Sequence, residues 1–208
     1  DISPNLMISA DAVSNIFNKL ELQAFKAGIT PRTTESRKWF QNKIKNMRNI
    51  NRDQLMSEEP IKKKSDGVVG NMYMFTYDPK HKETLPYYDT FPLVIVIGPA
   101  KGGFLGLNLH YLPPILRAKL LDGLMGITTN KSFNATTKFK LSYEMLQGAS
   151  SLKYYEPCLK HYLNSQVTSK FALVPSTEWE IATFLPTANF RGANSFKVYA
   201  DSKKALRG

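Results

Sequence analysis

The chain has 208 residues, of which 42% are hydrophobic, enough to bury one substantial core. Lysine and arginine outnumber aspartate and glutamate by 28 to 17, so the formal charge is +11. A surface this basic attracts nucleic acid, an anionic membrane or an acidic protein, and charge alone does not choose among them.

Several classes of protein are disfavoured by composition. The single cysteine, Cys158, excludes an intrachain disulfide and a cysteine-rich zinc site. The first thirty residues hold acidic side chains and no continuous apolar run, so no signal peptide is predicted. The longest apolar run, Phe91 to Ile97, is far shorter than the ~20 residues that cross a bilayer. We therefore expect a soluble protein.

Residues 1–50 predict an N-terminal helical arm. Apolar residues recur at helical spacing over 9–27, and Gly28 and Pro31 separate this helix from a second one, Thr34 to Arg48. The arm could pack on its own domain or on a neighbouring subunit. Residues 51–70 have no hydrophobic period and predict a linker into the main domain, 71–208.

The second helix carries the main functional signal that comes from the residues alone. The apolar stripe of this helix consists of Phe40, Ile44 and Met47, and the polar residues around it are almost all positively charged. Trp39 on the same helix could stack on an exposed base. Such a face contacts phosphates without reading sequence, docks on a protein, or is only solvated. The candidate DNA- or partner-binding residues are Arg37, Lys38, Lys43, Lys45 and Arg48, together with the linker run Lys62, Lys63 and Lys64.

The main domain opens with strand signals. Met72 to Tyr77 predicts a strand, and Leu93 to Ile97 predicts a strand buried on both faces. Gly98 to Gly103 predicts the turn of a hairpin whose second strand is Phe104 to Leu109. Pro113-Pro114 then begins a helix whose apolar stripe should lie on the sheet. The stripe consists of Ile115, Leu116, Leu120, Leu121, Leu124 and Met125.

The C-terminal third predicts short elements in alternation. We expect strands over 136–143 and 167–174, and a short helix over 157–163. Thr177 to Glu180 has capping-box spacing for a helix that ends before Pro186, and Asn194 can cap a basic helix over 196–206. The predicted fold is α+β: a small, mostly antiparallel sheet or open β-barrel wrapped by short helices.

No catalytic signature is found, and no cofactor or metal is expected. The turn Gly98 to Gly106 lacks the order of a phosphate loop and is followed by a strand. Cys158 and His161 would share one side of a helix, but two residues are too few for a metal site. The acidic residues Asp78, Glu83 and Asp89 could hold a divalent cation for nuclease chemistry, although Asp78 before Pro79 is typical of a turn.

Five segments together resemble a virion protein family of T-even-like contractile-tailed bacteriophages. They are WFQNKIKNMRNINRDQL (39–55), VGNMYMFTYDPKHKETLPYYDTFPLVIVI (69–97), GGFLGLNLHYLPPILRAKLLDGL (102–124), YYEPCLKHYLNSQVTSKF (154–171) and TEWEIATFLP (177–186). The family is the DNA end-protector, or head-completion, protein. The resemblance implies a virion protein without catalytic activity that sits at the ends of packaged double-stranded DNA and shields them.

The alternative is a structural tail, neck or baseplate subunit that binds other virion proteins. The resemblance implies a place in the virion, in the host cytoplasm during assembly, and in a symmetric assembly. It supplies no site residues, so the candidates above rest on charge alone.

Overall fold

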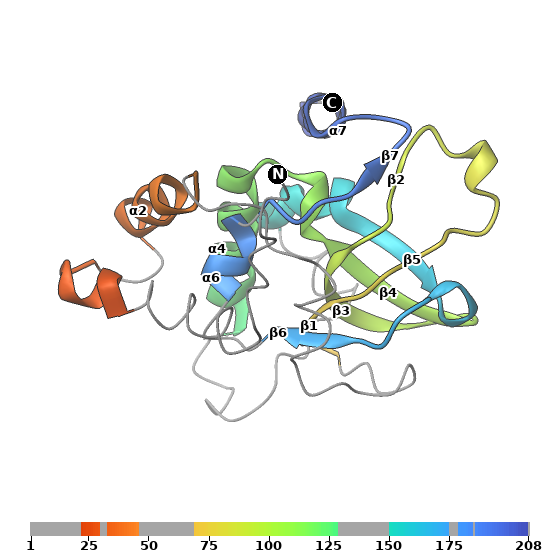
Figure 1. Cartoon of the computed structure of the whole chain (residues 1–208), viewed down its shortest axis with the longest axis horizontal. Helices are drawn as coiled ribbons and strands as arrows, with labels where there is room; N and C mark the ends of the chain where they lie inside the picture. The colour runs from red at the N-terminus through yellow and green to blue at the C-terminus, as the bar shows by residue number, and fades with distance from the viewer. Residues whose placement is uncertain are drawn as a thin grey trace, which may run out of the picture.

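The computed structural model describes residues 22–29, 33–45, 69–128, 150–174, 179–184 and 186–207, which form an α+β fold (Figure 1). Its centre is a five-stranded sheet in the order β5-β4-β3-β1-β6, with every neighbouring pair antiparallel. The strands are β1 (Met72–Met74), β3 (Leu93–Ala100), β4 (Gly103–Asn108), β5 (Leu159–Leu163) and β6 (Ala172–Val174). The predicted fold class is confirmed.

A smaller two-stranded sheet joins β2 (Tyr88–Asp89) to β7 (Phe190–Arg191). The helices of the main domain are α4 (Pro114–Thr128), α6 (Trp179–Phe184) and α7 (Ser195–Ala205). Short 3-10 helices connect the strands: η1 (Lys82–Thr84), η2 (Leu109–Tyr111), η3 (Ser150–Cys158) and η4 (Asn164–Gln166). No helix in the described ranges is long and apolar enough to span a membrane.

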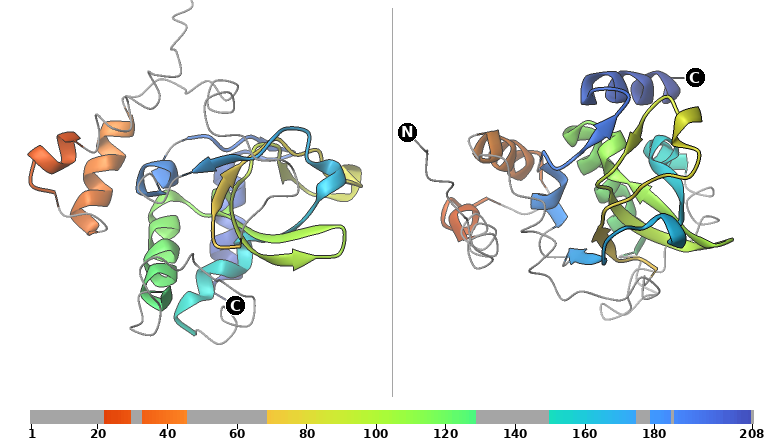
Figure 2. Two further views of the ribbon diagram at one scale, coloured as in Figure 1. Left: turned by 90° about the horizontal axis from the view of Figure 1, so that it is seen from below. Right: turned by 45° about the vertical axis from the view of Figure 1, so that its right-hand side comes forward.

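The large sheet curls because its two edge strands, β5 and β6, are joined by a short stretch of chain. After η4, Val167 forms an isolated antiparallel bridge with Tyr77, three residues beyond β1. The Tyr77 hydroxyl then accepts a hydrogen bond of 3.0 Å from the backbone N–H of Leu163 at the end of β5. Figure 2 shows the strongly curved sheet that results, with α4 and α6 beside it.

Alternation along the strands divides the core into two layers. Met72, Leu93 and Ile95 face the layer shared with α4, α6 and α7, and each is fully buried. The opposite face of the sheet holds an aromatic cluster around Phe75, whose ring lies 4.9–6.2 Å from four other rings, each packed edge to face. The prediction that Leu93 to Ile97 is buried on both faces is therefore confirmed.

The predicted hairpin is confirmed, with a later turn than expected. β3 continues to Ala100 through an irregularity between Val96 and Gly98, so the turn itself is Lys101-Gly102, where Gly102 has φ 73°. Gly103 follows at a point where β5 lies so close that a side chain would overlap the backbone carbonyl of Tyr162.

Helix α4 begins at the predicted proline step and packs on the sheet as expected through Leu116, Leu120, Leu121 and Leu124. The prediction for Ile115 is wrong, because this residue is 53% exposed on the first turn of the helix, and the side chain of Met125 lies outside those described. The predicted strand Met72 to Tyr77 also ends early, at Met74, and only Tyr77 pairs beyond it.

The predicted helix over 157–163 is wrong. Residues Leu159–Leu163 form β5, which pairs with β4 over the registers Gly103–Leu163 to Leu107–Leu159. The short segment has no strong helical period, and burial of Tyr162 against Phe104, with ring centroids 5.4 Å apart, favours the strand. The predicted strand over 167–174 is likewise shorter, because only Ala172–Val174 pairs continuously.

The last predicted helices agree with the structure. α7 begins after Asn194, whose side chain accepts a 2.9 Å hydrogen bond from the Lys197 N–H, as expected of an N-cap. α6 ends before Pro186, while its predicted capping residue Thr177 and the predicted strand over 136–143 lie outside the described residues.

Within the predicted arm, a short helix over 22–26 ends at Gly28, and α2 spans Thr34–Lys45. The remainder of the predicted helix 9–27, residues 46–48 and most of the linker lie outside the described residues. α2 contacts α6 of the main domain. The division into arm, linker and main domain stays a prediction.

Candidate nucleic-acid interface

One open cleft of about 640 Å³ lies between the β1–β2 loop, strand β5 and helix α7. We call it the aromatic–lysine cleft. Its lining is mainly tyrosine, proline and lysine, with Asp201, Ser202 and Ala205 contributed by α7. The tyrosines, prolines and lysines are Tyr77, Tyr87, Tyr88, Tyr111, Tyr162, Pro79, Pro86, Pro157, Lys80 and Lys160. Tyrosine rings beside cations are typical of surfaces that bind single-stranded nucleic acid.

The small sheet of β2 and β7 positions the tyrosine wall of the cleft. Tyr88 pairs with Arg191, which fixes the backbone of Tyr87 immediately before β2. The Tyr87 ring lies 6.2 Å from the Tyr111 ring and 6.4 Å from that of Phe190. Tyr87 is half-buried, so one part of the ring packs on this cluster while the rest is accessible from the cleft.

Helix α7 is held over the cleft by buried polar contacts. The Ser202 hydroxyl donates a 2.6 Å hydrogen bond to the carbonyl of Tyr111. The guanidinium of Arg117, which is 2% exposed, donates to the carbonyls of Leu112 and Thr183 and, at 2.8 Å, to the Tyr199 hydroxyl. One cation on α4 thus fixes the positions of α6 and α7 together.

Lys160 on β5 supplies a half-buried cation to the floor of the cleft. Its Nζ lies 3.9 Å from the centre of the Tyr111 ring, a cation–π contact. Burial lowers the pKa of Lys160 below its usual value, because a charged ammonium is less stable away from water. In the described part of the chain, no carboxylate forms a salt bridge with this lysine.

The two carboxylates that line the cleft are already engaged. Asp201 is 2.6 Å from Lys197 and also accepts from the Tyr87 hydroxyl, and these contacts lower its pKa. Asp89 lies behind the cleft, with its side chain 1% exposed, and bonds to the His110 imidazole at 2.7 Å. Neither is available to neutralise Lys160.

The Asp89 contact belongs to a buried polar network. The carboxylate accepts from His110 Nδ1, and His110 Nε2 lies 2.8 Å from the Thr187 hydroxyl oxygen. Asn108 and the Phe91 N–H also donate to Asp89. Burial by itself would raise the pKa of Asp89, but His110 and these donors lower it below its usual value.

The order acid, histidine, hydroxyl resembles that of hydrolytic triads, but the geometry does not favour catalysis. His110 is fully buried and Thr187 is 4% exposed, so a substrate cannot reach the hydroxyl. The network instead connects β2, η2 and the segment before β7, three regions far apart in sequence. It fixes the wall of the cleft from behind.

The structure separates the acidic residues that the sequence offers for a nuclease, and Glu83 lies 3.8 Å from the His81 imidazole. Asp78 is exposed and pairs with Lys82 at 2.7 Å, while Asp89 is buried in the network with His110. Within the described residues, no group of three or more histidine, cysteine or acidic side chains could hold a metal ion. Cys158 is likewise fully buried, and burial raises its pKa to about 12, whereas His161 is exposed on β5.

The cations predicted from sequence lie partly on α2. Lys38 and Lys43 are exposed there, and Lys43 Nζ lies 5.4 Å from the Trp39 ring centre. Arg37 and Lys45 belong to the same helix. Arg48 and the run Lys62, Lys63 and Lys64 lie outside the described residues. α2 is at one end of the molecule and the η1 loop is at the other (Figure 1). DNA contact by these residues stays a prediction.

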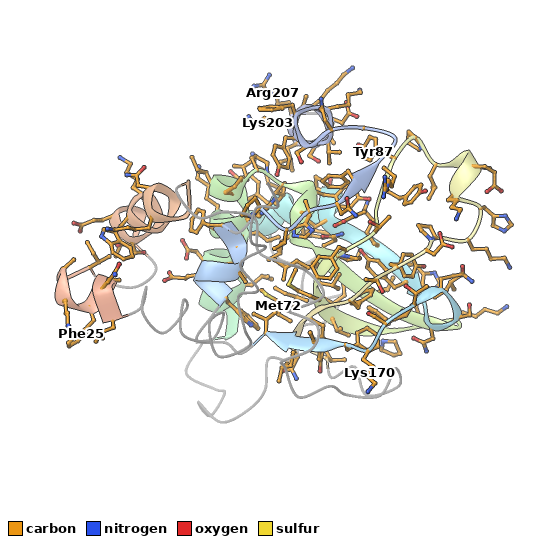
Figure 3. All side chains as sticks on the ribbon, viewed as in Figure 1. Phe25, Met72, Tyr87, Lys170, Lys203 and Arg207 are labelled. Atoms are coloured by element: carbon orange, nitrogen blue, oxygen red, sulfur yellow. The ribbon has the colours of Figure 1, made fainter. Side chains whose placement is uncertain are left out.

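The binding residues predicted from charge include neither the cleft nor any cation of α7. Residues 186–207 carry five basic side chains and one acidic side chain, and Lys203, Lys204 and Arg207 are exposed. Figure 3 shows Lys203 and Arg207 on the same side of the molecule as Tyr87, and Lys170 on the opposite side. The charge of α7 was visible in the sequence. The cleft was not, because Tyr87 and Lys160 are far apart along the chain.

Comparison with known families identifies a relationship for this chain. A family model described as phage T4 terminal DNA protecting protein matches residues 9–204, nearly the whole chain. This agrees with the resemblance drawn from the sequence segments. Neither the curated proteins nor the solved structures gave a match.

Proposed function

This chain belongs to the phage T4 terminal DNA protecting protein family, and we propose that it protects by covering the DNA end directly. It is a bacteriophage virion protein that protects the ends of phage DNA. On our proposal the contacts are made to phosphates, so the protein recognises the end of any sequence. The observation that carries the proposal is the distribution of exposed cations over two helices, α2 and α7.

The two helices suit phosphate contacts for the same reason. Lys38 and Lys43 on α2, and Lys203, Lys204 and Arg207 on α7, are all exposed. Lysine and arginine on exposed helices bind phosphates electrostatically and release condensed counterions. We also propose phosphate contacts for the other cations predicted from sequence, which are Arg37, Lys45, Arg48, Lys62, Lys63 and Lys64.

We also propose that protection involves no catalytic step. The only acid–histidine–hydroxyl arrangement in the described structure is buried, and the acidic loop residues point to different partners. A protein that excludes an exonuclease needs affinity for the end, not chemistry on it. Incubation of linear duplex with the protein and magnesium should leave the DNA intact, and cleavage would contradict this part of the proposal.

Other virion proteins are proposed as further partners of the N-terminal arm. Leu22 and Phe25, three positions apart on one short helix, are 52% and 79% exposed and offer an apolar contact to a neighbouring protein. This favours contact with a head or neck protein during assembly in the host cytoplasm. Changing Phe25 to Ser should reduce incorporation into particles while DNA binding persists, and unchanged incorporation would contradict it.

Binding of a linear duplex across a salt series tests the proposal. A protein with six to ten phosphate contacts loses about 10³–10⁵ in affinity between roughly 50 and 200 mM salt. Replacing Lys38 and Lys43 together with alanine should lower the salt slope by about 2, since each lysine contributes about 1. Lys170→Ala is the control, because Lys170 is also exposed but belongs to neither α2 nor α7. No binding by the unaltered chain at low salt would refute direct coverage.

A further inference from the structure

We propose that the aromatic–lysine cleft receives the terminal nucleotide of one DNA strand, with the base on Tyr87 and a phosphate at Lys160. This assignment rests on the proposed function and explains how a protein without sequence readout distinguishes an end from the interior of a duplex. An internal base pair presents no free base, whereas a terminal nucleotide unpairs at the lowest cost.

The size of the cleft fits this ligand. Its volume of about 640 Å³ lies within the roughly 300–1,000 Å³ of pockets that hold small molecules. A cleft of this volume has room for a single nucleotide and its phosphate, not for the paired strands of a duplex. The cleft therefore selects one unpaired nucleotide and leaves the remaining duplex outside. There the exposed cations Lys203, Lys204 and Arg207 of α7 lie on the same side of the molecule as Tyr87 (Figure 3).

The wall of the cleft provides a stacking surface. Tyr87 and Tyr88 are half-buried, Pro86 beside them is exposed, and all three line the cleft, so part of each side chain is accessible there. Bases stack on such rings with little regard for sequence, since every base has a π-face. The Tyr87 ring is supported by Tyr111 and Phe190 and thus keeps its orientation without a ligand.

The floor of the cleft provides a cation that has no carboxylate partner among the residues that the structure describes. Lys160 is half-buried and rests on Tyr111, and the cleft carboxylates Asp89 and Asp201 are bonded to other donors. The burial that lowers the pKa of Lys160 makes its charge costly when the cleft is empty. A phosphate entering the cleft would supply the missing counter-charge, and exposed Lys80 at the lining adds a second cation.

The test uses the full chain and DNA with 2-aminopurine, whose fluorescence reports stacking, at either the terminal or an internal position. We expect binding to change the fluorescence of the terminal probe only. Tyr87→Ala should abolish that change, whereas Tyr87→Phe, which keeps the ring, should retain it. Lys160→Met should lower affinity for a linear duplex with a short single-stranded overhang by about tenfold, and Lys160→Arg by less.

A covalently closed circular duplex is the reference ligand. The cleft assignment is supported if the variants Tyr87→Ala and Lys160→Met lose the preference for linear over closed DNA. Each variant protein should keep the melting temperature of the unaltered chain. If both variants keep the preference and the terminal probe signal, the assignment is overturned while end protection stands. If the unaltered chain itself shows no preference for linear DNA, the proposed function fails together with it.

Discussion

Arg117 is the side chain whose replacement should damage the fold most clearly. Its guanidinium is 2% exposed and donates three hydrogen bonds, to the carbonyls of Leu112 and Thr183 at 2.6 and 2.9 Å and to the Tyr199 hydroxyl at 2.8 Å. Arg117→Met keeps the buried stem but leaves these three acceptors without their donor.

The magnitude follows from two opposing terms. Hydrogen bonds to a charged group contribute about 1.5–3 kcal/mol each, so three of them represent about 4–9 kcal/mol. Removing the cation also removes its desolvation penalty, which offsets part of this loss. We expect a net destabilisation of about 3–5 kcal/mol, similar to that of breaking a buried ion pair. For a chain of this size the melting temperature should fall by about 6–20 °C.

Thermal and urea unfolding, followed by circular dichroism, measure the effect. Lys119→Met is the matched control, because Lys119 is exposed on the same helix and the chemical change is identical. The control should stay within about 0.5 kcal/mol of the unaltered chain. If Arg117→Met melts within about 2 °C of the control, the assignment of α6 and α7 to a common anchor is refuted.

Three further predictions concern single positions. In a urea titration, Gly103→Ala should lower the free energy of unfolding by about 2–4 kcal/mol, because the new methyl group overlaps the carbonyl of Tyr162. Gly98→Ala places its methyl group in open space and should leave the free energy of unfolding nearly unchanged. Asp89 has a folded pKa below its unfolded value, so its carboxylate stabilises the fold above the unfolded pKa, and this contribution is lost as pH falls through the folded pKa. Asp89→Asn should therefore lower the free energy of unfolding by about 3 kcal/mol at neutral pH, and by progressively less below about pH 4. A difference between the variant and the unaltered chain that does not change with pH would contradict this. Cys158, fully buried with its pKa raised to about 12, should resist iodoacetamide at pH 8 until the chain is unfolded in urea, and rapid labelling of the native protein would disprove its burial.

The parts of the fold that were predictable are those set by local sequence. The strand Leu93 to Ile97 is apolar at every position, so it had to be buried on both faces, and glycines mark the turn that follows. Asn194 caps α7 through a hydrogen bond with Lys197, which is only three positions later in the sequence. Such local patterns predict the structure correctly because these elements do not depend on residues that are distant in the sequence.

Strand β5 was missed because its conformation depends on a distant partner. Leu159–Leu163 pairs with β4, which lies more than fifty residues earlier, and the close approach at Gly103 is visible only in three dimensions. A short segment of this kind has no decisive period of its own, so tertiary pairing decides its conformation.

The candidate site shows the same division. The charge of α2 and α7 can be read from the sequence, but the aromatic–lysine cleft brings together Tyr87, Tyr111 and Lys160 from three separate segments of the chain. No motif connects these residues in the sequence, and the buried contact of Asp89 with His110 that supports them spans 21 positions. Function at this cleft follows from topology, not from a local pattern.

Exonuclease digestion of a long linear duplex in the presence of the full chain tests the central claim most directly. The same DNA as a nicked circle, treated with an endonuclease, serves as the reference substrate. At low salt the linear duplex should survive while endonuclease cleavage of the circle proceeds at its normal rate, and survival should disappear as salt is raised. Digestion of the linear duplex at the rate seen without protein, at low salt and saturating concentration, would contradict the claim.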